Sequence, residues 1–172
     1  IAAGGLCDGA SDAAVISLIE DLKKEGHGTV LIICAEEKEC VRTRDTLERF
    51  GLRASFYSSR DLNLYNITAS HDYEHERLKV LFGLASGLLD AVVTTPDAAL
   101  GFTIPPEVLC DYTVKIDFDS QIDIDDMAHK LTRAGYARVD MVDTPGQFAV
   151  RGGIIDIFPP FSRTEGTLPS GT

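Results

Sequence analysis

The sequence lacks an excess of positive charge, a cysteine pair with metal-ligand spacing, and any long apolar run. Its 172 residues include 16 Lys and Arg against 27 Asp and Glu, which gives a formal net charge of −11. Such a balance repels phosphodiester backbones, so autonomous DNA binding is disfavoured unless a local basic patch opposes the average. The apolar runs are far shorter than the roughly 20 residues that a membrane span needs, and we expect no membrane partner.

The cysteines also exclude two classes of small domain. Cys7, Cys34, Cys40 and Cys110 form no C-x-x-C pair and have no close histidine, which argues against a zinc ribbon or a disulfide framework. We therefore expect reduced thiols in a soluble, cytoplasmic protein. The chain begins with Ile1 and ends in a polar tail without periodicity, which indicates an excised piece of a longer protein.

Helical and strand patterns alternate through the first 105 residues. We expect helices over residues 11–22, 36–50 and 72–84, and strands over residues 29–34, 53–57 and 90–95. Ser11 or Asp12 is placed to cap the first helix. Residues 29–34 form a continuous β-branched run typical of a strand covered on both faces. Because such strands alternate with helices, the sequence predicts an α/β domain with a parallel sheet over residues 1–105.

The pattern changes after two consecutive prolines, Pro105 and Pro106. We expect a strand over residues 112–118, a helix over 123–134, and strands over 138–142, 147–151 and 154–158. Gly152 and Gly153 lie where a two-residue hairpin needs positive φ angles, and Pro145 and Gly146 supply the turn before it. Residues 106–172 are thus expected to form a smaller α+β domain with an antiparallel meander.

The glycine-rich start has the location of a phosphate-binding loop but not its chemistry. The stretch contains Gly4, Gly5 and Gly9. Aligning Gly4 and Gly9 with the loop glycines puts Ala10, Ser11 and Asp12 at the positions of the phosphate-binding lysine and the magnesium-binding hydroxyl. No lysine is present there, and an aspartate would repel a triphosphate. We interpret the segment as a helix-capping loop, compatible with a degenerate P-loop, and expect no nucleotide or magnesium cofactor in this chain.

Two further clusters have the residue types of metal sites without the complete pattern. His71 and His75 have helical i, i+4 spacing, but no third ligand is evident. An acidic group lacks the glycine and terminal glutamate of a calcium loop, and carboxylates at a helix start are favourable without any ligand. The acidic group comprises Asp117, Asp119, Asp123, Asp125 and Asp126. We expect no metal site, and no nucleophile motif indicates catalysis.

Arginines near the predicted second sheet are the remaining local signal. Arg138 and Arg151 lie on predicted strands, and Arg133 precedes them on a helix. In an antiparallel sheet, neighbouring arginines could present guanidinium groups for bidentate pairing with a partner's carboxylates. The alternative is that these side chains are simply solvated on the surface.

Two stretches resemble the N-terminal region of the bacterial transcription-repair coupling factors, and also UvrB, which shares that module. They are Gly-Tyr-Ala-Arg-Val-Asp at 135–140 and Pro-Gly-Gln-Phe-Ala-Val-Arg-Gly-Gly-Ile-Ile-Asp-Ile-Phe-Pro at 145–159. The second is highly specific, because it combines hairpin glycines, alternating strand residues and a terminal proline in one order. Residues 5–9, 72–78 and 90–95 extend the resemblance over nearly all of residues 1–160.

The resemblance implies a degenerate P-loop helicase-like α/β domain followed by a UvrB-type domain that binds UvrA. Arg138 and Arg151 match arginines of the family's UvrA-contacting surface, whereas Ala149 replaces a further arginine found in UvrB. Phe148 and Ile155 are assigned to packing, and Gly152 and Gly153 to the turn that aims Arg151. The residues after Pro160 depart from the family, in which more strands complete the second domain and a returning segment completes the first sheet.

The expected function is therefore recruitment of UvrA to stalled RNA polymerase, without catalysis by this chain. The parent's ATP-dependent motor, with its ATP and magnesium, and its contacts to RNA polymerase and DNA lie in segments absent here. One alternative is a divergent UvrB-type nucleotide-binding helicase fragment. Another is an autoinhibitory clamp that contacts the parent's translocase domains.

Overall fold

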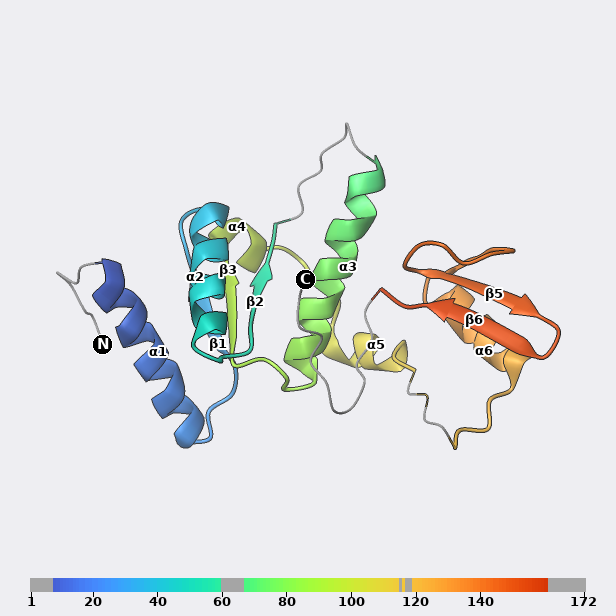
Figure 1. Cartoon of the computed structure of the whole chain (residues 1–172), viewed down its shortest axis with the longest axis horizontal. Coiled ribbons are helices and arrows are strands. Elements are labelled where there is room, and N and C mark those ends of the chain that lie inside the picture. Colours follow the sequence, from blue (N-terminus) through green and yellow to red (C-terminus); the bar gives the residue numbers. More distant parts are fainter. Residues whose placement is uncertain (1–7, 60–66, 115, 117–118, 161–172) are drawn as a thin grey trace. The chain divides into compact units, whose positions relative to one another are not determined.

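The computed structural model describes residues 8–59, 67–114, 116 and 119–160, and the chain divides into two compact units. The first unit comprises residues Ile1–Pro106 and the second Glu107–Thr172. Figure 1 labels the helices of both units and their strands other than β4. None of the described helices is long and apolar enough to cross a membrane.

The first unit is a small parallel α/β domain. Its elements are α1 (Asp8–Lys24), β1 (Val30–Ile33), α2 (Glu37–Arg49), β2 (Ala54–Tyr57), α3 (Ile67–Ala85), β3 (Ala91–Thr94) and α4 (Pro96–Ala99). The strand order is β1-β3-β2, and both strand pairs are parallel. The expected α/β class with a parallel sheet is confirmed, whereas a P-loop helicase-like fold is not.

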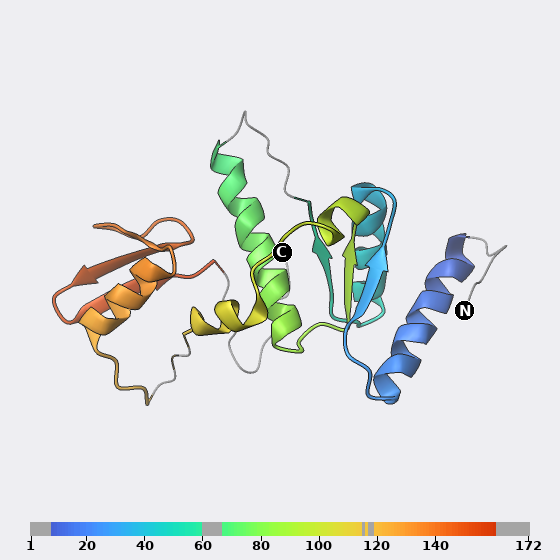
Figure 2. The ribbon, with the colours of Figure 1, turned by 180° about the vertical axis from the view of Figure 1, so that it is seen from behind.

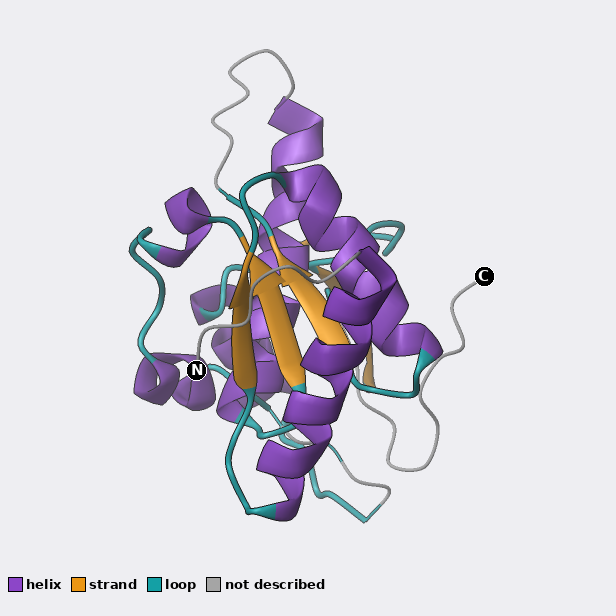
Figure 3. Cartoon of the chain, turned by 90° about the vertical axis from the view of Figure 1, so that its left-hand side faces the viewer, coloured by secondary structure: helices purple, strands orange, loops and turns teal. Residues whose placement is uncertain are grey.

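Helices lie on both faces of this sheet, as Figure 3 shows. On one face, α1 and α2 pack against the strands through a cluster that includes Ile19, Leu47 and Val93. On the other, α3 and α4 contribute Val80 and Ala98, which pack against β2 and β3. All four residues of β3 are buried because this central strand is covered from both sides.

One buried carboxylate joins three elements at the start of the strands. Asp90 precedes β3, and its side chain is only 4% exposed. Arg53 binds it through Nη2 at 2.7 Å and through its backbone N–H at 2.8 Å, and Lys23 of α1 lies at 3.0 Å. Burial alone would raise the pKa of the Asp90 carboxyl, but hydrogen bonds from Arg53 and Lys23 hold it well below its usual range.

The first helix begins earlier than its expected cap. Because α1 starts at Asp8, Ser11 and Asp12 lie inside the helix, and their expected capping role is wrong. Three alanines at 10, 13 and 14 favour helix at this end, since alanine has the highest helix propensity.

The second unit packs one helix against a three-stranded sheet. After α5 (Pro106–Asp111), which spans the unit boundary, its elements are α6 (Ile124–Arg133), β4 (Ala137–Arg138), β5 (Gln147–Arg151) and β6 (Ile154–Phe158). Met127 and Leu131 of α6 pack on the fully buried Phe148 of β5, with Ile155 and Tyr136 partly buried beside them. The helix therefore covers one face of the sheet (Figures 1 and 2).

Two expectations for this unit are wrong. Residues 112–114 and 116 form no strand; α5 precedes them, and its end is closed by the Thr113 hydroxyl, which donates to the Leu109 carbonyl at 2.9 Å. The sheet is also not an antiparallel meander, because β4 is only two residues long and pairs parallel to β5. The chain returns before β5 through Gly146, whose φ is +83° and whose carbonyl accepts the Ala137 N–H.

Candidate protein-interaction surface

The second sheet has one covered face and one open face. Along β5, Phe148 and Val150 point toward α6, so the alternating residues of this strand point to the opposite face. The register pairs β5 and β6 antiparallel, which puts six residues on that opposite face. We call this the outer face; it comprises Gln147, Ala149, Arg151, Ile154, Asp156 and Phe158.

A tight hairpin joins the two strands of the outer face. Arg151 pairs with Ile154, so Gly152 and Gly153 form a two-residue turn, as expected. Only Gly152 has a positive φ, at +59°, which suits the first central position of a type II′ turn. The expectation of positive φ angles therefore holds for one glycine of the two. The turn ends β5 directly after Arg151.

Arg151 is exposed and has a counter-ion on its own sheet. Its side chain is 62% exposed, and its Nη2 donates to Oδ2 of Asp156, which is 40% exposed. The two residues are diagonal neighbours on the outer face, since Asp156 pairs directly with Ala149. An exposed ion pair of this kind contributes only about 0–1 kcal/mol to stability. Among the described residues Arg151 makes this one side-chain hydrogen bond, and a guanidinium has further N–H groups that can bind another carboxylate.

Arg138 lies on the other side of the sheet. It pairs with Phe148 in the parallel register of β4 and β5, and directly paired residues point to the same face. Arg138 therefore shares the face of Phe148, at the exposed edge strand, and has no ion-pair partner among the described residues. The structure does not bring Arg138 and Arg151 together on one face.

Two residues expected to support the site by packing, Phe148 and Ile155, both lie on the face that α6 covers. Phe148 is fully buried and Ile155 partly buried, both in the cluster with α6. The sequence reasoning did not single out the exposed apolar residues of the outer face, Ile154 and Phe158. Their i, i+2, i+4 spacing with Asp156 along β6 was the signal that could have found them, because alternate residues of a strand share one face.

The segment expected to be a degenerate P-loop is helical where it is described. Gly9, Ser11 and Asp12 belong to α1, while Gly5 lies outside the described residues. A P-loop instead wraps phosphates with a glycine-rich turn between a strand and a helix. The described part of this segment does not form such a turn.

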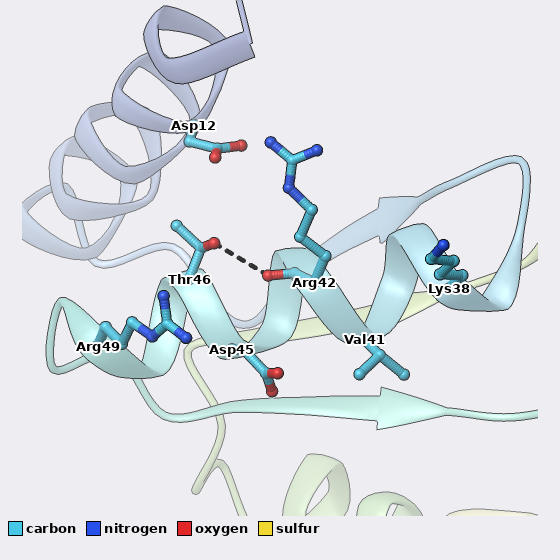
Figure 4. A pocket seen from close by; sticks show the side chains of 7 residues that line it. All are labelled: Asp12, Lys38, Val41, Arg42, Asp45, Thr46 and Arg49. Carbon is cyan, nitrogen blue, oxygen red and sulfur yellow. Dashed lines mark hydrogen bonds between the residues drawn. The ribbon is translucent and has the colours of Figure 1, made fainter.

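Asp12 lines an open groove between α1 and α2 of about 430 Å³. Figure 4 shows Arg42 of α2 pointing toward Asp12 across the groove, with Lys38 and Arg49 farther along the same helix. Asp45 also lines the groove. The two carboxylates oppose the three cations, so the groove has the mixed charge of an ordinary helix surface.

Part of the acidic candidate cluster has a structural explanation in the described residues. Asp123 caps α6: its Oδ1 accepts the Asp125 and Asp126 N–H groups at 2.9 and 3.0 Å. Asp126 also pairs with Lys130 at 2.7 Å. Within the described residues, no three His, Cys, Asp or Glu side chains form a group that could hold a metal ion. Asp117 and the side chain of His71 lie outside what the structure describes.

Two thiols meet in the core of the first unit. Cys34 follows β1 and Cys40 lies in α2, and both are buried free cysteines. Burial and the neighbouring Cys34 raise the pKa of the Cys40 thiol to about 11. The thiol of Cys40 therefore stays protonated at neutral pH and packs as a small apolar group.

Comparison with known families defines the class of the second unit. Residues 114–167 match the UvrB interaction domain, and these residues include α6 and the whole of the second sheet. The outer face and its arginine thus belong to a region that matches a family of interaction domains.

The chain is also similar to bacterial transcription-repair-coupling factors. The chain is 41% identical to that of Bacillus subtilis (strain 168) over 92 residues, which are 53% of this chain and 8% of the relative. It is 27% identical to that of Staphylococcus aureus (strain USA300) over 166 residues, which are 91% of this chain and 14% of the relative. These matches confirm the resemblance to the N-terminal region of this family, and the chain spans about a seventh or less of each relative.

Proposed function

We propose that this chain is a non-catalytic interaction module that recruits UvrA during transcription-repair coupling. The observation that supports this most is the outer face: an exposed arginine and exposed apolar side chains on a sheet that matches the UvrB interaction domain. In this proposal the chain acts in the cytoplasm, and the contacts with RNA polymerase, DNA and ATP belong to other parts of the parent protein.

The binding chemistry is pairing of guanidinium groups with carboxylates of UvrA. Arg138 and Arg151 are the proposed cations, and both are exposed in a chain with a net charge of −11. Arginine suits this role because its planar donors match a carboxylate in bidentate geometry. Removing one partner of a desolvated charge pair at an interface costs about 2–5 kcal/mol, or roughly 30-fold to several thousand-fold in affinity.

Calorimetric titration with purified UvrA tests the proposal. We expect saturable binding by the wild type and loss of binding in the double variant Arg138→Glu, Arg151→Glu. The matched control is Arg42→Glu, Arg49→Glu, which changes the net charge equally on exposed positions of α2 in the first unit. Circular dichroism verifies the fold of both variants. Absence of wild-type binding, or equal loss in both double variants, contradicts UvrA recruitment through the second sheet.

The proposal also includes the absence of nucleotide chemistry in this chain. A ligand at 100 times its dissociation constant stabilises a fold by about 2.7 kcal/mol. We therefore expect ATP with magnesium to leave the thermal unfolding of the chain unchanged. A saturable rise in melting temperature would favour the divergent nucleotide-binding alternative.

A further inference from the structure

We infer that a groove in the first unit, between α3 and the loop that follows α4, binds a basic amphipathic helix of a partner protein. All the residues that line this groove lie between positions 74 and 104, within the first unit. The outer face belongs to the second unit, so this binding site is additional to the proposed recruitment of UvrA. Three features of the groove support it: the lining, an exposed aromatic side chain, and the charge.

The groove is lined by one helix face and one loop. Glu74, Leu78 and Leu81 contribute the helical side, at the i, i+4, i+7 spacing of a single face of α3. Residues 102–104 contribute the loop side, and the volume between the two sides is about 230 Å³. Small-molecule sites usually measure roughly 300–1,000 Å³, so this groove suits side chains of a protein partner better than a cofactor.

Phe102 differs from the rest of the lining because almost none of its side chain is covered. It is 98% exposed, and Leu100 in the same loop is 86% exposed. Leu78, Leu81 and Ile104, which line the same groove, are only partly buried. Covering an aromatic ring removes a large apolar area from water, and aromatic residues are enriched at protein interfaces. Packing within the described residues does not use the Phe102 ring, which is therefore available to a partner.

The charge of the groove determines the chemistry of its partner. Its two charged lining residues are Glu74 and Arg77. Arg77 is buried: its guanidinium donates to the Ser58 carbonyl and the Tyr57 hydroxyl, and it lies 4.1 Å from the centre of the Tyr57 ring. Glu74 is exposed and has no ion-pair partner among the described residues. The groove therefore presents one accessible carboxylate beside an apolar surface.

These features match a helix that carries a lysine or arginine one turn away from apolar residues. Side chains three and four residues apart lie on one face of a helix. A partner helix laid along α3 thus places a cation opposite Glu74 and apolar side chains opposite Leu78 and Leu81. An acidic helix is disfavoured by the Glu74 carboxylate and by the net charge of −11. A second copy of this chain is disfavoured for the same reason, because two copies repel each other.

Calorimetric titration of the chain with a designed peptide tests the inference. The probe is an amphipathic peptide of leucine and lysine with about 18 residues, which is long enough to form a helix. The control peptide has glutamate in place of every lysine. We expect saturable binding of the lysine peptide and binding of the glutamate peptide that is weaker by about tenfold or more.

Two variants with matched controls locate the binding site. Phe102→Ser and Glu74→Lys should each weaken binding of the lysine peptide by about fivefold or more. The control for the first is Phe50→Ser, because Phe50 is 66% exposed elsewhere in the same unit. The control for the second is Glu76→Lys, which changes the charge equally on α3 at a residue that does not line the groove. Each control should change the affinity by less than about twofold.

The remaining outcomes would overturn the inference. Equal loss in Glu74→Lys and Glu76→Lys would show that the peptide responds to the net charge of the chain and not to the groove. Unchanged binding in Phe102→Ser, or no binding by the wild type, would also contradict the groove as the site. Because Phe102 is almost fully exposed, its variant should keep the fold, which circular dichroism verifies. Titration with UvrA tests the proposed function separately, so either claim can fail alone.

Discussion

The two sheets of this protein differ in how completely their faces are covered. Helices pack on both faces of the first sheet, and the central strand β3 is buried throughout. In the second sheet α6 covers one face, and the outer face keeps an exposed arginine beside exposed apolar side chains. The central strand of the first sheet thus uses all its side chains for folding, whereas β5 and β6 of the second sheet keep exposed side chains on one face.

The first sheet has one uncovered patch, and it is chemically different from the outer face. Leu31 and Ile33 of β1 are 57% and 55% exposed on the face that α3 covers only over β2 and β3. They are apolar and belong to a strand with no charged residue. The family resemblance implies a returning segment that completes this sheet, and this stays a prediction.

Removing the central side chain of the second core gives the largest expected effect. Phe148→Ala should destabilise the second unit by about 3–5 kcal/mol, because Phe148 is fully buried against α6. Hydrogen exchange measured by mass spectrometry should accelerate across β5 and β6. The backbone amides of β1–β3 should exchange as in the wild type.

Leu47→Ala is the reciprocal variant for this comparison. Leu47 is 1% exposed in the core of the first unit, so its truncation should cost about 2–5 kcal/mol there. Exchange should then accelerate in β1–β3 and remain unchanged in β5 and β6. If either variant accelerated exchange equally in both units, the two cores would not be independent.

Replacing the buried carboxylate of the first unit should have an intermediate effect. Asp90→Asn leaves Arg53 and Lys23 without their shared counter-ion, and we expect a loss of about 1–3 kcal/mol at pH 7. The folded-state pKa of Asp90 is lowered, so its stabilisation is present above its unfolded pKa of about 3.9 and is lost as the pH falls below that value.

Urea unfolding at pH 7 and between pH 4 and 2 measures this contribution. The wild type should lose more stability than Asp90→Asn over the acidic range, so the two curves should converge. Parallel curves would show that the Asp90 cluster does not stabilise the fold.

Substitutions in the hairpin of the outer face should change the free energy of unfolding the least. Its two glycines give a matched pair of variants. Gly152→Ala should destabilise the second unit by about 1 kcal/mol, because Gly152 has a φ of +59°. Gly153→Ala should be neutral or slightly stabilising, since its φ is not positive and an added Cβ meets no atom within 4 Å. Urea midpoints of the two variants measure the difference, and equal midpoints would contradict the turn geometry.

Much of the first unit could be predicted because its elements carry strong local patterns. The β-branched run that includes Val30 and Ile32 predicted a parallel strand covered on both faces. The structure confirms the parallel strand, but one of its faces is open, because Leu31 and Ile33 are exposed. The short helices α4 and α5 were missed. Both helices have proline as their first residue, where a helix does not need the backbone N–H that proline lacks. The helix that begins at Pro106 was not predicted, because the apolar residues that follow it have a strand pattern.

The site was predictable in its residue types but not in its geometry. Strand direction depends on where the chain returns, and no local pattern determines whether β4 pairs parallel or antiparallel with β5. That pairing decides the face on which Arg138 lies. The exposure of Ile154 and Phe158 likewise depends on α6 packing on the opposite face, which the sequence does not specify.

The difference between the two sheets is tested most directly by mapping hydrogen exchange of this chain with and without purified UvrA. The account predicts slower exchange across residues 147–158 in the complex and unchanged exchange in β1, β2 and β3. Protection concentrated in the strands of the first unit, or no protection at residues 147–158 when UvrA is bound, would contradict the outer face as the interaction surface.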